Sequence, residues 1–521
     1  MEFFREVAMG WGKVAVLGAV IGAAGVVGCA QRGPYGLPAM EADTSVMVSG
    51  EKYDKIVENV FLDAASHPLS TFSIDVDTAS YSNVRRMLTD GALPPAGAVR
   101  IEEMINYFNY EYPQPEGDEP FSVTVEMVAC PWKKGHKLAR IGLKGREINT
   151  DQRPATNLVF LLDVSGSMNS SDKLPLVKEA MSMLVETLRE NDRVAIVTYA
   201  GSSGVALEPT NDPRKIRQAF GKLNASGSTN GGQGIHQAYK LAKENFIKEG
   251  INRVILCTDG DFNVGVTSND ELVDLIEDKA SEGVFLSVLG FGTGNLNDSM
   301  MEKLADKGNG NYAYIDSVLE AEKVLVEQMS GTLMTIAKDV KIQVDFNPAK
   351  VQSYRLIGYE NRMLKAEDFK DDQKDAGEIG AGHTVTALYE IVPPGVDVEP
   401  SKYQQPTKPV ELTDAAMTDE MFVVRLRYKK PDGQESQEFR VEAKDVEREF
   451  DEASGDLKFA SSVAAFGMLL RGSEYKGSVT FDDVIEIAKE NKGEDENGYR
   501  AEFVSLVKLA KRMEGKKGDE S

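Results

Sequence analysis

The chain has 521 residues, of which 41% are hydrophobic and 27% are charged, and its formal net charge is -24. This length exceeds what one hydrophobic core supports, so we expect about two to four domains. The acidic balance, with an isoelectric point of about 4.8, disfavours nucleic acid as a partner, because binding to phosphate backbones depends on clustered Lys and Arg.

The N-terminus has the pattern of an export signal. Residues 14–28 form an uncharged run of apolar and small residues, which follows Arg5 and Lys13 and ends at Cys29. The run is shorter than the roughly 18 residues of a membrane-spanning helix and has the length of the apolar part of a signal peptide. We therefore expect residues 1–28 to be a signal peptide, with an uncleaved anchor as the alternative.

The tetrad Val26-Val27-Gly28-Cys29 resembles the bacterial lipobox, in which the chain is cut before a cysteine that receives lipid. This resemblance implies that Cys29 is the lipidated N-terminus of an exported, membrane-anchored lipoprotein of the cell envelope. Ala30 resembles the residue of lipoproteins sorted to the outer membrane, which implies its periplasmic face if the cell has two membranes. Residues 29–65 then comprise the lipidated cysteine and a flexible tether.

Two further cysteines, Cys130 and Cys257, remain after Cys29. Cys257 lies inside an apolar strand pattern, so the geometry of a disulfide between the two is not expected. We predict two buried thiols.

Residues 66–120 are predicted to form an N-terminal α/β region with one strand and two helices. Asp75, Asp77 and Ser80 lie between the strand and the first helix. They allow a cation site, but acids and hydroxyls at a helix start are more often caps that satisfy free N–H groups. We favour the capping interpretation.

Strand patterns flank the middle of the chain on both sides. Residues 121–150 and 332–450 are rich in alternating strands with turn signals, which is typical of a β-sandwich. Residues 151–331 lie between them, so we predict that this segment is inserted into the sandwich. Residues 451–521 contain amphipathic patterns that predict a C-terminal helical region.

The inserted segment alternates strictly between apolar strands and amphipathic helices. This order predicts an α/β fold with a doubly wound, mostly parallel, Rossmann-like sheet. The predicted strands are 158–162, 193–199, 253–258, 284–289 and 312–315.

Oxygen-bearing side chains follow three separated parts of this segment. Asp163, Ser165 and Ser167 follow the first strand, Thr229 precedes a helix, and Asp259 follows the strand 253–258. In open α/β sheets ligands bind at the carboxyl ends of the strands. Carboxylates and hydroxyls together form an all-oxygen ligand set for a hard cation.

The sequences DVSGS, GSTNGG and TDG, in this order, resemble the metal-ion-dependent adhesion site of the von Willebrand factor type A domain. The resemblance implies that Asp163, Ser165, Ser167, Thr229 and Asp259 hold Mg²⁺, with Mn²⁺ or Ca²⁺ as alternatives. It also implies a protein partner that presents an Asp or Glu to the metal.

Flanking patterns extend this resemblance to a bacterial lipoprotein family that carries the domain. They include FSIDVDTASYSNVRRML, VRIEEMINYFNY and FGMLLRGSEYKG. Met168, Asp261 and Phe262 are predicted to rim the site and contact the partner.

Two alternatives to cation-dependent binding are an envelope scaffold with an incidental metal site and a metal-assisted hydrolase. The four histidines show no metal-ligand spacing such as HExxH, and no nucleophile elbow or phosphate loop is present. The run Gly290-Phe291-Gly292-Thr293-Gly294 lacks the lysine of a phosphate loop, so we interpret it as a plain loop. The prediction is a non-enzymatic binding protein.

Overall fold

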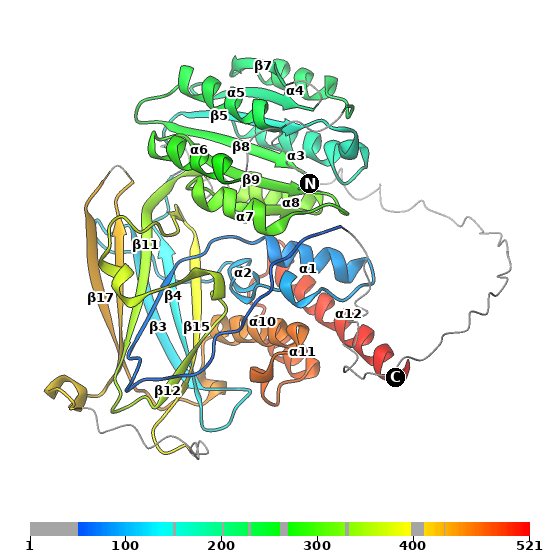
Figure 1. The fold of residues 1–521 in the computed structure, drawn as a ribbon. Helices are drawn as coiled ribbons and strands as arrows, with labels where there is room; N and C mark the ends of the chain where they lie inside the picture. The colour runs from blue at the N-terminus through cyan, green and yellow to red at the C-terminus, as the bar shows by residue number, and fades with distance from the viewer. Residues whose placement is uncertain are drawn as a thin grey trace, which may run out of the picture. The chain divides into compact units, whose positions relative to one another are not determined.

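The computed structural model describes residues 50–149, 153–200, 203–227, 231–260, 269–328, 333–396, 411–431 and 433–520. These residues form a β-sandwich, a layer of helices and an α/β domain (Figure 1).

The sandwich has two antiparallel sheets, and its strands come from both sides of the α/β domain in the sequence. The first sheet has the order β1-β12-β15-β4-β3, and the second has the order β13-β2-β11-β16-β17, with β14 paired to β11. The strands are β1 Leu62–Asp63, β2 Leu69–Ser73, β3 Phe121–Ala129, β4 Lys137–Gly145, β11 Thr335–Phe346, β12 Ser353–Ile357, β13 Met363–Leu364, β14 Ile379–Gly380, β15 Thr384–Val392, β16 Glu420–Lys429 and β17 Ser436–Lys444.

Alternation along the strands builds the core between the two sheets. Ile342 and Val424 from the second sheet share one buried cluster with Leu143 and Val385 from the first. Successive side chains of a strand point to opposite faces, so the intervening polar side chains of β11 and β16 point away from this core.

Helices cover the outer face of the first sheet. They are α1 Ala79–Thr89, α2 Ile101–Asn106, α10 Gly455–Arg471, α11 Phe481–Glu490 and α12 Tyr499–Glu520. Val128, Leu138 and Leu388 of the sheet belong to the same buried cluster as the apolar residues of these helices. Strand β15 is therefore buried on both faces, which explains its nearly continuous apolar sequence.

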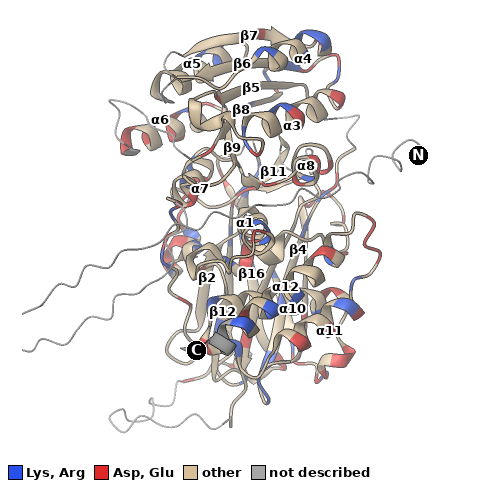
Figure 2. Cartoon of the chain, turned by 90° about the vertical axis from the view of Figure 1, so that its right-hand side faces the viewer, with Lys and Arg blue, Asp and Glu red and all other residues tan. Residues whose placement is uncertain are grey.

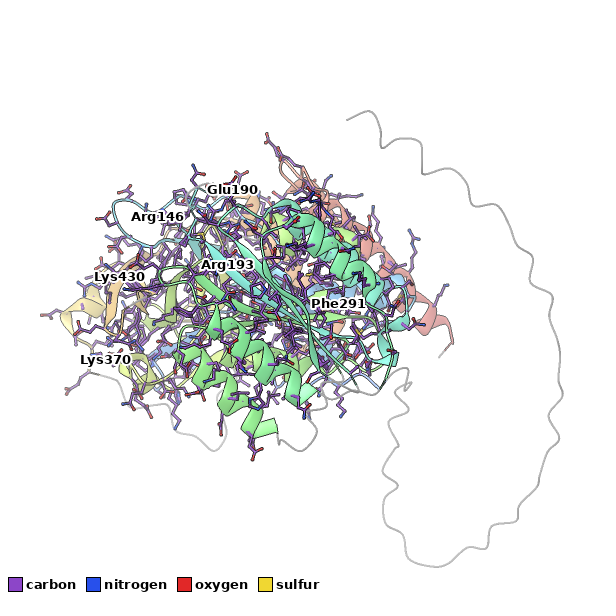
Figure 3. All side chains as sticks on the ribbon, turned by 90° about the horizontal axis from the view of Figure 1, so that it is seen from above. Arg146, Glu190, Arg193, Phe291, Lys370 and Lys430 are labelled. Atoms are coloured by element: carbon purple, nitrogen blue, oxygen red, sulfur yellow. The ribbon has the colours of Figure 1, made fainter. Side chains whose placement is uncertain are left out.

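The inserted domain is a doubly wound α/β sheet, as the sequence predicted. Its strand order is β10-β9-β8-β5-β6-β7, and every neighbouring pair is parallel except β6 and β7. The strands are β5 Thr156–Asp163, β6 Arg193–Tyr199, β7 Gly204–Thr210, β8 Ile251–Thr258, β9 Phe285–Phe291 and β10 Tyr312–Ile315. In the view from above, Arg193 and Phe291 mark opposite ends of the strands (Figure 3).

Helices pack on both faces of this sheet and form two separate cores. Helices α3 Leu174–Glu186, α4 Pro213–Lys222 and α8 Val318–Glu322 contribute to one core. Helices α5 Gly231–Glu244, α6 Asn269–Ser281 and α7 Asp298–Lys307 contribute to the other. Because β5 lies in the middle of the sheet, all of its residues are buried, and this burial explains the apolar run from Leu158 to Leu162.

Buried arginines join the α/β domain to the helical layer and the sandwich. Arg85 of α1 donates to Glu320 at 2.7 Å, and Arg100, just before α2, donates to Asp298 at 2.7 Å. Arg362 of the sandwich forms an ion pair with Glu302 of α7 at 3.4 Å. In the view of Figure 2, basic and acidic residues are interspersed along the helices instead of forming one continuous basic surface.

Two predicted boundaries differ from the structure. Strand β2, which we placed in a separate N-terminal region, pairs with β11 inside the sandwich. Residues 50–65, which we placed in the tether, contact the fold: the Lys52 N–H donates to the Leu296 carbonyl at 2.8 Å, and Asn59 donates to the Gly358 carbonyl at 2.8 Å. Both contacts join residues far apart in the sequence, so local patterns carry no signal for them.

Cys130 and Cys257 are both buried and unbridged, as predicted. Burial raises the pKa of both thiols. Among the residues that the structure describes, no helix is both long and apolar enough to cross a bilayer. The predicted signal peptide and Cys29 lie outside the described residues.

Candidate functional site

The parallel register of two adjacent strands brings two buried acids to one edge of the sheet. Leu162 of β5 lies opposite Cys257 of β8. Asp163 is the last residue of β5, and Asp259 follows the end of β8. Both carboxyl groups belong to fully buried residues, and each influences the other electrostatically.

The loop after β5 folds back on Asp163. The Ser165 N–H donates to Asp163 Oδ1 at 2.8 Å, and the Ser165 and Ser167 hydroxyls lie 2.9 Å apart. Ser165 is buried, whereas Ser167 is exposed. Four of the five predicted ligands are thus in one place, and of these four only Ser167 is exposed to solvent.

Burial raises the pKa of Asp163 to about 6, although hydrogen bonds from Ser165 oppose the effect; the Asp259 carboxylate raises the pKa further. Within the described residues, no group meets hydrogen-bond geometry to Asp163 Oδ2, and the nearby Tyr199 hydroxyl only moderates the pKa. A buried carboxylate oxygen without a full set of donors is costly unless a cation is bound there. This oxygen and the serine hydroxyls fit a hard divalent cation.

Asp259 has a cationic neighbour that sequence reasoning missed. The Lys173 ammonium donates to Asp259 Oδ2 at 2.9 Å and to Asn295 Oδ1 at 3.2 Å. Burial raises the pKa of Asp259, but the hydrogen bond and charge of Lys173 outweigh it, so the pKa lies below its usual value. Lys173 is 86 residues from Asp259 in sequence, so no local motif could have paired them.

Thr229 lies outside the described residues, and its role as a ligand stays a prediction. The stem of its loop is described. The Ser226 N–H donates to the Val164 carbonyl at 2.7 Å, and the Gly166 N–H donates to the Gly227 carbonyl at 3.1 Å. The stem of the Thr229 loop is therefore hydrogen-bonded to the loop that carries Ser165.

The predicted contact role of Met168 is wrong. A short 3-10 turn at Gly166–Asn169 directs Met168 inward, where it is fully buried in one of the two cores of the domain. An apolar thioether is more stable there than in water. Asp261 and Phe262, the other predicted rim residues, lie outside the described residues.

The capping interpretation of Asp75, Asp77 and Ser80 is also wrong. The residue that caps α1 is Thr78, and its side chain makes no capping hydrogen bond. Asp77 instead accepts from the Tyr312 N–H of β10 at 2.8 Å, and both acids form ion pairs with Arg362. Asp77 thus contacts the edge strand β10 of the α/β sheet, and Asp75 and Asp77 together contact Arg362 of the sandwich.

The four histidines lie outside the site that contains Asp163 and Asp259. His136 pairs with Glu390 at 2.6 Å, and burial, together with the nearby charge of Lys144, lowers the pKa of His383 to about 4. His67 and His236 are exposed. Across the described ranges, no three His, Cys, Asp or Glu side chains form a cluster that could hold a metal ion.

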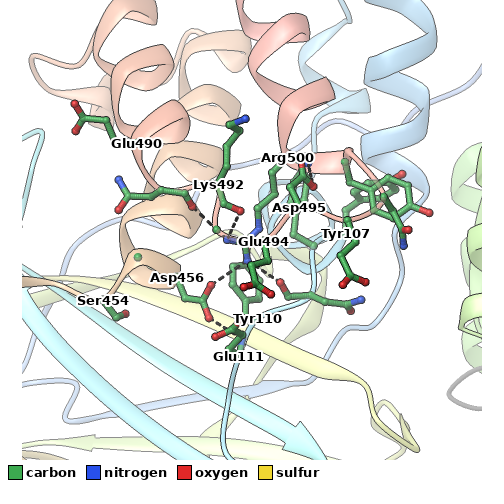
Figure 4. A pocket seen from close by; sticks show the side chains of 18 of the residues that line it. Tyr107, Tyr110, Glu111, Ser454, Asp456, Glu490, Lys492, Glu494, Asp495 and Arg500 are labelled. Carbon is green, nitrogen blue, oxygen red and sulfur yellow. Dashed lines mark hydrogen bonds and ion pairs between the residues drawn. The ribbon is translucent and has the colours of Figure 1, made fainter.

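A pocket of about 710 Å³ lies away from this sheet edge, among the helices (Figure 4). The Arg500 guanidinium lines it and donates to Asp456 at 2.9 Å and to the Asn109 carbonyl at 2.8 Å. These contacts join the starts of α10 and α12 to the segment after α2. The pocket contains none of the predicted ligands.

The fold and the sequence order of the site define a class of protein. Residues 158–261 match the family described as von Willebrand factor type A domain, residues 47–140 match von Willebrand factor, and residues 331–513 match the C-terminal part of the uncharacterized protein YfbK. The α/β unit is thus a von Willebrand factor type A domain.

The similarity to one relative covers most of the chain. The uncharacterized protein YfbK of Escherichia coli (strain K12) is 43% identical over 472 residues, which are 88% of this chain and 81% of YfbK. The chain therefore belongs to the bacterial von Willebrand factor type A family that includes YfbK. The human inter-alpha-trypsin inhibitor heavy chain H3 is 28% identical over 192 residues, 34% of this chain and 21% of that protein.

Among solved structures, a von Willebrand factor type A protein from Catenulispora acidiphila is 17% identical and has a TM-score of 0.40. The match covers 74% of this chain and 90% of the Catenulispora chain. BatB from Bacteroides thetaiotaomicron is 23% identical, covers 34% of this chain and 97% of its own, and has a TM-score of 0.29.

Proposed function

We propose that this protein is a non-enzymatic, lipid-anchored protein of the cell envelope that binds a protein partner through a divalent cation. Asp163, Ser165, Ser167 and Asp259, with Thr229, hold the cation, and Mg²⁺ is the preferred ion over Mn²⁺ and Ca²⁺. When bound, the ion accepts a carboxylate from an Asp or Glu of the partner. The lipid on Cys29 attaches the protein to the membrane.

One observation carries this proposal: Asp163 and Asp259 are fully buried at a sheet edge that opens to solvent at Ser167. Two buried acids that share one ammonium, beside one exposed hydroxyl, make a poor structural arrangement by themselves, since their mutual repulsion and the desolvation of Asp163 oppose folding. They make a suitable cation site, because few charged ligands leave the ion able to attract an additional carboxylate. Among the described residues no histidine lies at this edge, so a hydrolase would have to use one of the proposed metal ligands as its general base.

The test is a pull-down from envelope extract with the wild-type protein and the Asp163→Ala and Thr229→Ala variants, each with Mg²⁺ and with EDTA. We expect capture of a partner by the wild type in Mg²⁺ only. Capture that persists in both variants and in EDTA would instead support the scaffold alternative.

Point variants are a better test than removal of the α/β domain. Such a deletion would leave Arg85 and Arg100 of the helical layer without Glu320 and Asp298. Arg85 would keep Glu502 and Arg100 would keep Glu103, but the loss of the other acids at these buried arginines would destabilise the remaining fold, so loss of binding would have two explanations.

The membrane anchor has its own test. Mass spectrometry of the mature N-terminus should find a lipid-modified Cys29, and Cys29→Ala should release the protein from the membrane fraction. A mature chain that begins elsewhere and stays in the membrane would contradict this part of the proposal.

A further inference from the structure

Lys173 is built into the candidate site. Only 6% of this lysine is exposed, and its ammonium contacts Asp259 Oδ2 at 2.9 Å and Asn295 Oδ1 at 3.2 Å. A buried ammonium that touches a predicted metal ligand is a fixed positive charge at the place where a cation would bind.

The loop after β9 holds the aliphatic part of this lysine. Gly292 has a φ of +70°, and a Cβ atom at this position would lie 2.2 Å from Lys173 Cγ. Only glycine provides both this backbone conformation and the room for the lysine. Within the glycine-rich run that does not match a phosphate loop, Gly292 thus has a structural use, because its missing Cβ leaves a channel for the Lys173 side chain.

The rest of that loop is fixed from both sides. On one side, the Lys52 N–H donates to the Leu296 carbonyl at 2.8 Å and the Asp298 N–H donates to the Lys52 carbonyl at 3.2 Å. On the other side, Gly260, next to Asp259, packs so closely that an added Cβ would lie 2.7 Å from the Asn295 carbonyl oxygen. The amide of Asn295, and with it the lysine ammonium, therefore has a defined position beside Asp259.

We propose that Lys173 sets the ion preference and the affinity of the candidate metal site by occupying one oxygen of Asp259. This inference rests on the proposed cation-binding function. Because the ammonium contacts Oδ2, Asp259 can offer an ion or an ion-bound water only its other oxygen. Bidentate carboxylates favour Ca²⁺, which takes six to eight oxygens, whereas Mg²⁺ accepts single oxygens in an octahedron. Lys173 thus disfavours Ca²⁺.

The positive charge of Lys173 also offsets one of the two acids, Asp163 and Asp259. An ion at the site is therefore bound less tightly and attracts a partner carboxylate more strongly. Lys173 is a positioning residue, since it acts through Asp259.

The experiment is a titration of the full-length protein with Mn²⁺, followed by electron paramagnetic resonance, with Mg²⁺ and Ca²⁺ as competitors. Lys173→Met keeps the aliphatic chain in the channel and removes the charge. We expect Mn²⁺ to bind about tenfold tighter, as a unit charge near a divalent ion predicts, and the gain for Ca²⁺ to exceed the gain for Mg²⁺.

Lys178→Met is the matched control, because it removes the same charge from α3, the helix that Lys173 precedes, and Lys178 donates to the Leu223 carbonyl away from the site. Its affinities should equal those of the wild type. Asn295→Ala keeps the lysine but removes its second acceptor, so a smaller gain is expected. If Lys173→Met does not fold, as judged by circular dichroism, Asn295→Ala tests the inference in its place.

Unchanged or weaker Mn²⁺ binding by folded Lys173→Met, or an equal gain for Ca²⁺ and Mg²⁺, would overturn the inference while leaving the cation site intact. Absence of Mn²⁺ binding to the wild type would overturn the proposed function as well. The two failures are therefore distinguishable.

Discussion

Buried carboxylates occur in two regions of the α/β domain, and the protein neutralises them differently. At the junction with the helical layer, Asp298 and Glu320 accept from the guanidinium groups of Arg100 and Arg85. At the carboxyl edge of the sheet, Asp163 accepts a backbone N–H, and within the described part of the chain no guanidinium is paired with it.

The difference separates acids that hold the structure from acids that we propose to bind a cation. Arginine matches a carboxylate with several donors and stays charged, so the acids of the junction are satisfied within the fold. The pKa of Asp163 is raised to about 6 because burial is not balanced by such a partner. A shifted pKa of a buried carboxyl group at the carboxyl edge of a sheet is typical of functional sites.

The largest effect on stability should follow from a substitution at the junction between the α/β domain and the helical layer. Asp298→Asn removes the charge that faces Arg100 and weakens the hydrogen bond from the Tyr312 hydroxyl, which now measures 3.0 Å. Because the buried arginine then loses a partner, we expect the free energy of unfolding to fall by about 3 kcal/mol. Urea unfolding monitored by circular dichroism measures it. A loss below about 1 kcal/mol would show that the junction acids are not structural.

The same Asp-to-Asn substitution at the sheet edge should have the opposite effect: it should weaken metal binding and change stability little. Asp163→Asn should weaken Mn²⁺ binding about 100-fold, which corresponds to about 2.7 kcal/mol, because a charged ligand is lost. The free energy of unfolding without metal should change by less than about 1 kcal/mol, since a poorly compensated acid is removed. Calorimetric titration and urea unfolding of the same sample test both parts, and strong destabilisation would remove the contrast between the two regions.

Removal of the metal should have a smaller effect on stability, and this effect should again distinguish the sheet edge from the junction. At a Mg²⁺ concentration ten times the dissociation constant, ligand linkage stabilises the wild type by about 1.4 kcal/mol. EDTA should abolish this stabilisation. We expect Asp298→Asn to retain the Mg²⁺ increment and Asp163→Asn to lack it, as measured by the shift of the thermal midpoint in scanning calorimetry. An increment that survives in Asp163→Asn would locate the ion elsewhere.

The effect that is smallest per step of the titration concerns the buried base Lys323 at the junction. Burial lowers the pKa of Lys323 from 10.5 to about 7, although the nearby Glu320 opposes the shift. Between pH 7 and 10.5 the unfolded chain binds more protons at this residue than the folded chain, so stability rises with pH. The slope is on the order of 1 kcal/mol per pH unit. Lys323→Met should lack this contribution in urea unfolding at several pH values, and identical slopes would contradict it.

Local patterns were sufficient for the secondary structure and for the order of the ligands. Apolar runs such as Leu158–Leu162 and the helical periodicity after them identify a parallel sheet, because each element buries its own side chains in a fixed period. Asp163, Ser165 and Ser167 lie within one loop, so their proximity follows from the sequence alone. Asp259 joined them because carboxyl ends of parallel strands share one edge.

The tertiary structure decided every feature that depends on residues far apart in the chain. Strand β2 joined the sandwich through β11, Asp77 reached β10 instead of capping a helix, and Met168 turned into the core. The most consequential case is Lys173, which contacts Asp259 through a channel formed at Gly292. Hydrogen bonds and packing between distant segments leave no period in the sequence, and for that reason they became visible only in the folded chain.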